Sequence, residues 1–275
     1  GVKKFLEYQP EVVVAVGGGS AIDSSKAIRE FALKINNYGK VGLIAIPTTS
    51  GTGSEVTSFA VVNDTDNHVK YPLISDSLTA DEAILDAELV KSVPPSITAD
   101  TGMDVLTHAI ESYVSVMASD YTRGLSLQAI KLVFENLEHS YRFGDEESRE
   151  KMHNASTMAG MAFANAFLGI NHSLSHKLGG WFHIPHGTAN ALLFPFVCRF
   201  NAQRHPYKMG TFSQYDHPHT LARYAEVADY LKLGGTTDEE KLENLIAAVD
   251  ELKAKIGIKK TIRDYGIDET DFLTR

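Results

Sequence analysis

Four of the chain's 11 histidines lie in one stretch, His172-Ser-Leu-Ser-His176-Lys-Leu-Gly-Gly-Trp-Phe-His183-Ile-Pro185-His186-Gly187. His172 and His176 are four residues apart, so on a helix they share a face, one turn apart. Pro185 favours the first turn of a new helical segment that carries His186. Imidazoles delivered in this way are typical ligands of a divalent transition metal. The stretch therefore predicts a metal centre that is built on helices.

A second pair with the same spacing lies upstream, in Gly102-Met-Asp104-Val-Leu-Thr-His108. On a helix, Asp104 and His108 share a face, and Asp104 adds a carboxylate to the imidazoles. The alternative is a hydrogen-bonded pair on a helix surface. Because a carboxylate with several imidazoles suits a divalent transition metal, we favour a shared metal site.

The start of the chain has the pattern of a phosphate-binding turn. Glu11-Val-Val-Val-Ala-Val16 is an apolar run typical of a strand buried on both faces, and residues 1–9 before it resemble the tail of a helix. Gly17-Gly18-Gly19-Ser20 follows, and a helical pattern begins near Ala21. The free N–H groups of such a turn, with the helix dipole, favour an anion. Ile22 replaces the third glycine of the usual dinucleotide motif, so a plain tight turn is the alternative.

The remaining pattern predicts an α/β half and a helical half. Val41–Ile46 and Glu82–Asp86 are expected strands, and Phe59–Asn63 and Val69–Ile74 an expected hairpin. After Pro94-Pro95 the apolar spacing is helical, over 98–117, 122–141, 146–167, 220–233 and 238–256. We therefore expect an α/β domain over residues 1–94 and an all-helical domain over 95–275.

Composition narrows the class of protein. The formal net charge of −9 and the pI of about 5.6 argue against a nucleic-acid or anionic-membrane partner. No apolar run reaches the roughly 20 residues of a membrane span. A single cysteine, Cys198, excludes an internal disulfide and suits a reducing cytoplasm. Because the chain opens without a methionine, we expect a piece of a longer protein.

Four motifs, in order along the chain, resemble the iron-containing (group III) alcohol dehydrogenases. They are Val14–Ser20, the hydroxyl-rich loop Pro47-Thr-Thr-Ser-Gly-Thr-Gly-Ser-Glu-Val-Thr57, Gly102–His108 and Pro185-His186-Gly187. Three further segments, Phe163–Phe167, Phe182–His186 and Thr211–Asp216, resemble the alcohol-dehydrogenase half of bifunctional aldehyde–alcohol dehydrogenases.

The resemblance implies a partial Rossmann-like dinucleotide-binding domain followed by an all-helical metal-binding domain, as in the dehydroquinate synthase-like fold. It implies metal ligands at Asp104, His108, His172 and His186, and a catalytic role beside the nicotinamide for His176. It implies NAD(H)-binding positions at Gly18, Gly19, Ser20, Asp23, Thr48, Thr49, Thr52, Thr57 and Lys70. Further ligation or support of a ligand by His176, and an acid/base role for His183, are the alternatives.

The reaction implied by the resemblance is hydride transfer between NAD(H) and a short-chain aldehyde or primary alcohol, with acetaldehyde and ethanol as the expected pair. Four protein ligands would fill a tetrahedron, so a substrate needs a fifth position, which favours Fe(II) over Zn(II). A polyol dehydrogenase of the same fold is the alternative enzyme. The family also implies a homo-oligomer, and the bifunctional enzymes imply a filament. In the family, a segment before the position of Gly1 distinguishes NAD from NADP.

Overall fold

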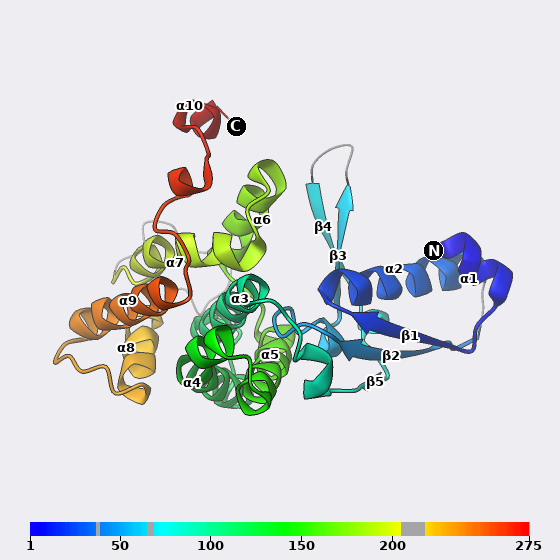
Figure 1. Ribbon diagram of the computed structural model, residues 1–275, viewed down its shortest axis with the longest axis horizontal. Helices are drawn as coiled ribbons and strands as arrows, with labels where there is room; N and C mark the ends of the chain where they lie inside the picture. The colour runs from blue at the N-terminus through cyan, green and yellow to red at the C-terminus, as the bar shows by residue number, and fades with distance from the viewer. Residues whose placement is uncertain (37–38, 65–68, 205–217, 275) are drawn as a thin grey trace.

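The computed structural model describes residues 1–36, 39–64, 69–204 and 218–274. Figure 1 shows the strands with the first two helices on one side of the molecule and the remaining helices on the other. Every strand in these ranges precedes Pro94, and the long helix α3 begins at Pro95. The mixed fold predicted from the sequence, α/β followed by all-α, is confirmed. A domain boundary at Pro94-Pro95 stays a prediction.

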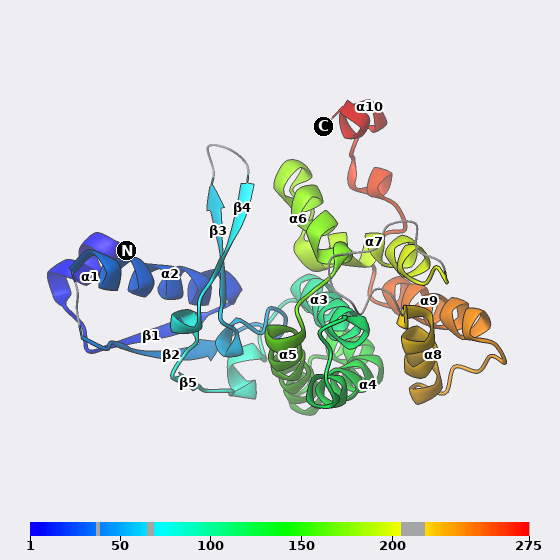
Figure 2. The same ribbon diagram turned by 180° about the vertical axis from the view of Figure 1, so that it is seen from behind.

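The first half is built on a small parallel sheet in the order β1-β2-β5. β1 (Val12–Gly17) and β2 (Gly42–Pro47) pair along six residues, whereas β5 (Glu82–Ala83) is shorter than the predicted strand. Helix α2 (Gly19–Asn36) connects β1 to β2 and buries Ile22 against Leu43 and Ala45. α1 (Val2–Tyr8) packs against α2 (Figure 2). This packing fixes the glycine turn at the end of β1.

The expected burial of β1 on both faces is wrong. Val12, Val14 and Val16 are 48%, 54% and 57% exposed, whereas Ala15 is buried under α2. An apolar run indicates that a strand prefers apolar surroundings on both faces. The described residues supply a covering layer on one side only, so alternate side chains of β1 remain open to solvent.

A separate antiparallel hairpin, β3 (Phe59–Asp64) with β4 (Val69–Ile74), is anchored to α2 by buried polar groups. The ammonium of Lys26 donates to the carbonyl oxygens of Thr57 and Phe59 at 2.7 and 2.8 Å. The carboxylate of Asp23 accepts from the backbone N–H of Val61 at 2.9 Å. Burial lowers the pKa of Lys26 to about 8, although the carboxylates of Asp23 and Glu55 oppose this. The anchored hairpin extends to the same side as α6, which contacts β4 (Figures 1 and 2).

The second half consists of helices, most of which pack around one main apolar core, while α6 and the start of α7 share a smaller one. The helices are α3 (Pro95–Val114), α4 (Asp120–Arg142), α5 (Glu146–Ala166), α6 (Ile170–Phe182), α7 (His186–Asn201), α8 (Thr220–Tyr230), α9 (Asp238–Lys255) and α10 (Glu269–Thr274). Short 3-10 turns lie at Ser54–Val56, Asp76–Leu78, Ala87–Val90 and Ile262–Tyr265. α3 is central: Met103, Leu106 and Ile110 are almost completely buried in the main core. No helix in the described ranges is long and apolar enough to cross a membrane.

The loop after β2 is fastened to one face of α5. Ser50 Oγ lies 2.9 Å from His153 Nδ1, and Thr157 donates to the buried carboxylate of Glu55 at 2.7 Å. One turn further along α5, Gly160 lies against Gly53, whose backbone is left-handed with φ +60. A Cβ at Gly160 would lie 2.9 Å from the Cα of Gly53. The loop and the helix therefore meet backbone to backbone.

This contact predicts that alanine variants at two glycines in long helices differ in stability. Gly160→Ala is expected to cost about 1–3 kcal/mol of unfolding free energy, because the new methyl group has no space. Gly124→Ala on α4 is the matched control: its Cβ would meet nothing within 4 Å, so it should stabilise by about 0.5–1 kcal/mol. Denaturant unfolding of both variants measures this, and equal effects would contradict the close contact.

Candidate active site

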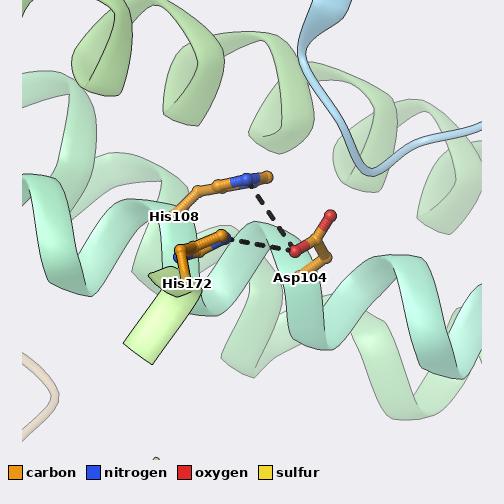
Figure 3. A group of neighbouring side chains, drawn as sticks. All are labelled: Asp104, His108 and His172. Carbon is orange, nitrogen blue, oxygen red and sulfur yellow. Dashed lines mark ion pairs between the residues drawn. The ribbon is translucent and has the colours of Figure 1, made fainter. Parts of the chain in front are cut away.

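Helix α3 presents two of the predicted ligands on one buried face. Asp104 and His108 are one helical turn apart and are 4% and 5% exposed (Figure 3). The ring of His108 is stacked between those of Phe163 and His172, with centroids 4.5 Å away on each side. These contacts hold the imidazole beside the carboxylate. The His108 Nδ1 atom is buried without a hydrogen-bond partner, and the Nε2 atom faces Asp104.

The other two predicted ligands come from α6 and α7. His172 is buried in the first turn of α6, and His186 is the half-buried first residue of α7. All three imidazoles direct Nε2 at the same oxygen, Asp104 Oδ1. The separations from this oxygen are 3.4 Å for His172, 3.5 Å for His186 and 3.8 Å for His108. Residues far apart in the sequence thus meet at one point.

The start of α7 explains the sequence Pro185-His186-Gly187. Pro185 is the N-cap, and the next turn is held by Asp100, whose carboxylate accepts from the Thr188 N–H at 2.7 Å and its hydroxyl at 2.9 Å. A Cβ at Gly187 would overlap the carbonyl oxygen of Asp100 on α3. Only glycine allows α7 to begin this close to α3, and this approach brings His186 to Asp104.

The charges at this point favour a neutral ring at His108 beside an ionised carboxylate at Asp104. Burial would raise the pKa of Asp104, but the neighbouring imidazoles outweigh it and hold this pKa well below its usual range. Burial lowers the pKa of His108 to about 3. Burial also opposes protonation of His172, but hydrogen bonds with Asp104 and Glu111 outweigh it and raise its pKa to about 9. Asp104 is therefore anionic at neutral pH, and a proton and a cation would compete for His172 Nε2.

The arrangement fits a transition-metal ion. Donor atoms bound at about 2.1 Å to one ion lie roughly 3.0–3.4 Å from one another, close to the separations from Asp104 Oδ1 found here. The ligand atoms of Asp104, His108 and His172 all lie within 4.8 Å of one another. One carboxylate with neutral imidazoles is a donor set for iron or zinc. His186 lies outside this group of three, and 26% of its side chain is exposed.

Two polar residues at this point were missed in the sequence. Asn190 follows His186 by four residues and donates its amide N–H to Asp104 at 2.8 Å. Glu111 lies two turns after Asp104 on α3, is 5% exposed, and contacts His172 Nδ1 at 2.5 Å. Helical spacing from Asp104 and from His186 is the signal that could have found them. Their side-chain types alone indicate no metal site.

His176 and His183 differ in position. His176 is half-buried on α6, one turn after His172, and its ring centroid lies 5.0 Å from that of His186. It therefore adjoins the cage of ligands, and its predicted catalytic role stays a prediction. His183 is exposed at the C-cap of α6, with left-handed backbone at φ +58.

The glycine turn and the threonine loop lie against each other at the start of α2. A Cβ at Gly18 would lie 3.1 Å from the Thr49 hydroxyl, and a Cβ at Gly19 would meet the side chain of Thr52 at 2.5 Å. Ser20 is exposed in the first turn of α2. The backbone N–H of Thr48 donates to the carbonyl of Gly17 at 3.0 Å, which joins the loop to β1. Predicted cofactor-binding residues from the two segments are thus adjacent.

The other predicted cofactor-binding residues have different surroundings. Asp23 accepts hydrogen bonds from Ser54 and Val61, and burial raises its pKa despite these bonds. Thr57 is 2% exposed, and its hydroxyl lies 3.2 Å from the Lys26 ammonium. Both residues hold the hairpin, and their contact with a cofactor stays a prediction. The side chain of Lys70 and the segment Thr211–Asp216 lie outside the described residues.

Comparison with known proteins gives matches over nearly the whole chain. Residues 1–87 match the iron-containing alcohol dehydrogenase family, and residues 98–274 match the C-terminal part of the Fe-containing alcohol dehydrogenase family. The chain is 50% identical to an aldehyde-alcohol dehydrogenase of Streptococcus pneumoniae, over 99% of its own length and 33% of that protein's. It therefore spans about a third of that relative.

Two further relatives are matched over most of their length. The chain is 42% identical to an NADPH-dependent butanol dehydrogenase of Clostridium saccharobutylicum, over 99% of this chain and 70% of that protein. The structure of a sulfoacetaldehyde reductase of Bifidobacterium kashiwanohense in complex with NAD+ is 33% identical and has a TM-score of 0.83. That match covers 99% of this chain and 70% of the other. The chain belongs to the iron-containing alcohol dehydrogenase family.

Proposed function

We propose that this chain is the alcohol-dehydrogenase part of an aldehyde–alcohol dehydrogenase, interconverting acetaldehyde and ethanol by hydride transfer with NAD(H). The observation that carries the proposal is the convergence of His108, His172 and His186 on the buried carboxylate of Asp104. The identity of 50% to an aldehyde-alcohol dehydrogenase favours the short-chain aldehyde among the family's substrates.

The proposed metal is Fe(II), with Zn(II) as the alternative, held by Asp104, His108, His172 and His186. A divalent ion there supplies Lewis acidity, which polarises an aldehyde oxygen and lowers the pKa of an alcohol. The protein positions the donors: α3 supplies the carboxylate and one imidazole, while α6 and α7 each add an imidazole. The half-buried His186 and His176 leave this side of the cage accessible to a small substrate. We assign the proton transfer to His176, which adjoins His186.

The proposed cofactor site is the turn Gly18-Gly19-Ser20 with the threonines of the following loop, Thr48, Thr49 and Thr52. The turn opens the 18-residue helix α2, whose free N–H groups and dipole suit a pyrophosphate. We propose NAD(H) as the cofactor. An NAD+ complex of one relative supports it, while the name of the butanol dehydrogenase relative records NADPH. We further propose a cytoplasmic enzyme that assembles as a homo-oligomer, with a filament as one form.

Metal dependence tests the proposal directly. The protein at its full natural length, purified without oxygen, should contain about one iron per chain and reduce acetaldehyde with NADH. Chelation should abolish this activity, and Fe(II) should restore it, because the Lewis acid is lost and regained. Parallel assays with NADPH and with glycerol distinguish the cofactor and the polyol alternative. Full metal occupancy with oxidation of glycerol alone would contradict the proposal.

Replacing one proposed ligand, and one nearby histidine as a control, should show which of the two binds the metal. His186→Ala should lose metal and turnover together, by more than the roughly 10–100-fold that follows loss of a ligand's hydrogen-bond partner. The fold should persist, because His186 is half-buried in the first turn of α7. His183→Asn is the matched control: it removes an exposed histidine nearby and tolerates left-handed backbone, so metal content should not change. Metal retained in His186→Ala would remove His186 from the site.

A further inference from the structure

Glu111 connects two helices of the metal cage. It lies on α3, on the face that carries Asp104 and His108, and is buried. One carboxylate oxygen accepts from the backbone N–H of Asn171 at 2.8 Å. The other contacts the His172 Nδ1 atom at 2.5 Å and the backbone N–H of His172 at 3.3 Å. Glu111 thus bonds both the ring and the backbone of a proposed ligand.

We propose that Glu111 is the positioning residue that fixes His172 as a metal ligand, by accepting a hydrogen bond from Nδ1 and so leaving the Nε2 lone pair directed at the metal. The proposal rests on the proposed metal role of His172. It concerns a residue that binds neither metal nor substrate.

The tautomer follows from the geometry. A neutral imidazole carries one N–H, and a carboxylate can only accept, so the hydrogen lies on Nδ1 when Glu111 is its partner. Nε2 then carries the lone pair, 3.4 Å from Asp104 Oδ1 and 3.2 Å from the amide nitrogen of Asn190. The surroundings of the other two rings differ: His108 Nδ1 is buried without a hydrogen-bond partner, and His186 Nδ1 faces the Ser175 hydroxyl at 3.4 Å.

The start of α6 is built to accept this carboxylate. Its N-cap, Gly169, provides no side-chain hydrogen bond to the first turn, and Glu111 takes that role from α3. A Cβ at Gly169 would lie 2.7 Å from Glu111 Oε1, so glycine leaves the space for the contact. Two backbone N–H groups and the imidazole of His172 surround this carboxylate, so each of its oxygens has a donor.

Asp100 provides a matched comparison on the same helix. Its carboxylate holds the first turn of α7 through the Thr188 N–H and hydroxyl, as Glu111 holds the first turn of α6. It differs in one respect, because these two bonds come from a backbone N–H and a hydroxyl and not from an imidazole. At position 100 an Asn oxygen can still accept both bonds, because one oxygen of the Asp100 carboxylate makes them. At position 111 a Gln oxygen can still accept from the Asn171 N–H. Only at Glu111 does the change also replace the acceptor of His172 Nδ1.

The experiment compares Glu111→Gln with Asp100→Asn in the protein at its full natural length. Two quantities are measured: the dissociation constant for Co(II) by competition with a chelator, and the ligand-field absorption spectrum of the Co(II) protein. Glu111→Gln should weaken binding about 10–100-fold and alter the spectrum, because the amide N–H favours the tautomer with Nε2 protonated. Asp100→Asn should leave the spectrum unchanged and affinity within about threefold.

Each outcome decides the proposal. Equal affinity and spectrum in Glu111→Gln and the unaltered protein would overturn it, as would equal losses in both variants, which would mark a general effect of helix capping. A wild-type protein that binds no Co(II), Fe(II) or Zn(II) would overturn the proposed metal function and the role of Glu111 with it. Metal binding and activity in the wild type with an unaffected Glu111→Gln would overturn the role of Glu111 alone.

Discussion

The site depends on the burial of one carboxylate, that of Asp104 on the central helix α3. An ion buried without partners costs several kcal/mol, so this helix can occupy the core only if other groups compensate it. The compensation comes from His108 on the same helix, His172 on α6, and His186 with Asn190 on α7. The positions of α6 and α7 are thereby constrained by electrostatics as well as by packing. Gly187 and Asp100 then determine how closely α7 can approach.

Helix α5 links the proposed cofactor loop to the proposed metal site. Along one of its faces, Thr157 and Gly160 hold the loop after β2, and one turn later Phe163 stacks on His108. Hydride transfer requires two reacting carbons at a fixed short separation, which a loosely joined pair of domains would not maintain. In the proposed enzyme, a single helix that contacts both the threonine loop and the ring of His108 would provide that constraint. The proposed metal ligands and the threonine loop are thus joined through the same helix.

The sequence predicted the fold, and the helix faces of the candidate ligands, where the determining pattern was local. Pairs four residues apart placed Asp104 with His108 and His172 with His176 on helix faces, and the strands and long helices followed from apolar spacing. The role of Glu111 was not predicted, because a glutamate on a helix is usually solvated. Its partner is the start of another helix, 60 residues later in the chain. The exposure of one face of β1 was not predicted, because an apolar run does not show which faces of the strand other elements cover.

The motif residues around the cofactor loop show why a family pattern does not translate directly into ligand contacts. Asp23 and Thr57 belong to the pattern, yet the structure uses their polar groups to hold the hairpin on α2. Gly18 and Gly19 admit a phosphate in principle, but they also admit the side chains of Thr49 and Thr52, which a Cβ would displace. Replacing such a glycine would disturb the loop before any cofactor binds. The pattern therefore combines residues that could touch the ligand with residues that shape the surface it meets, and only their contacts separate the two.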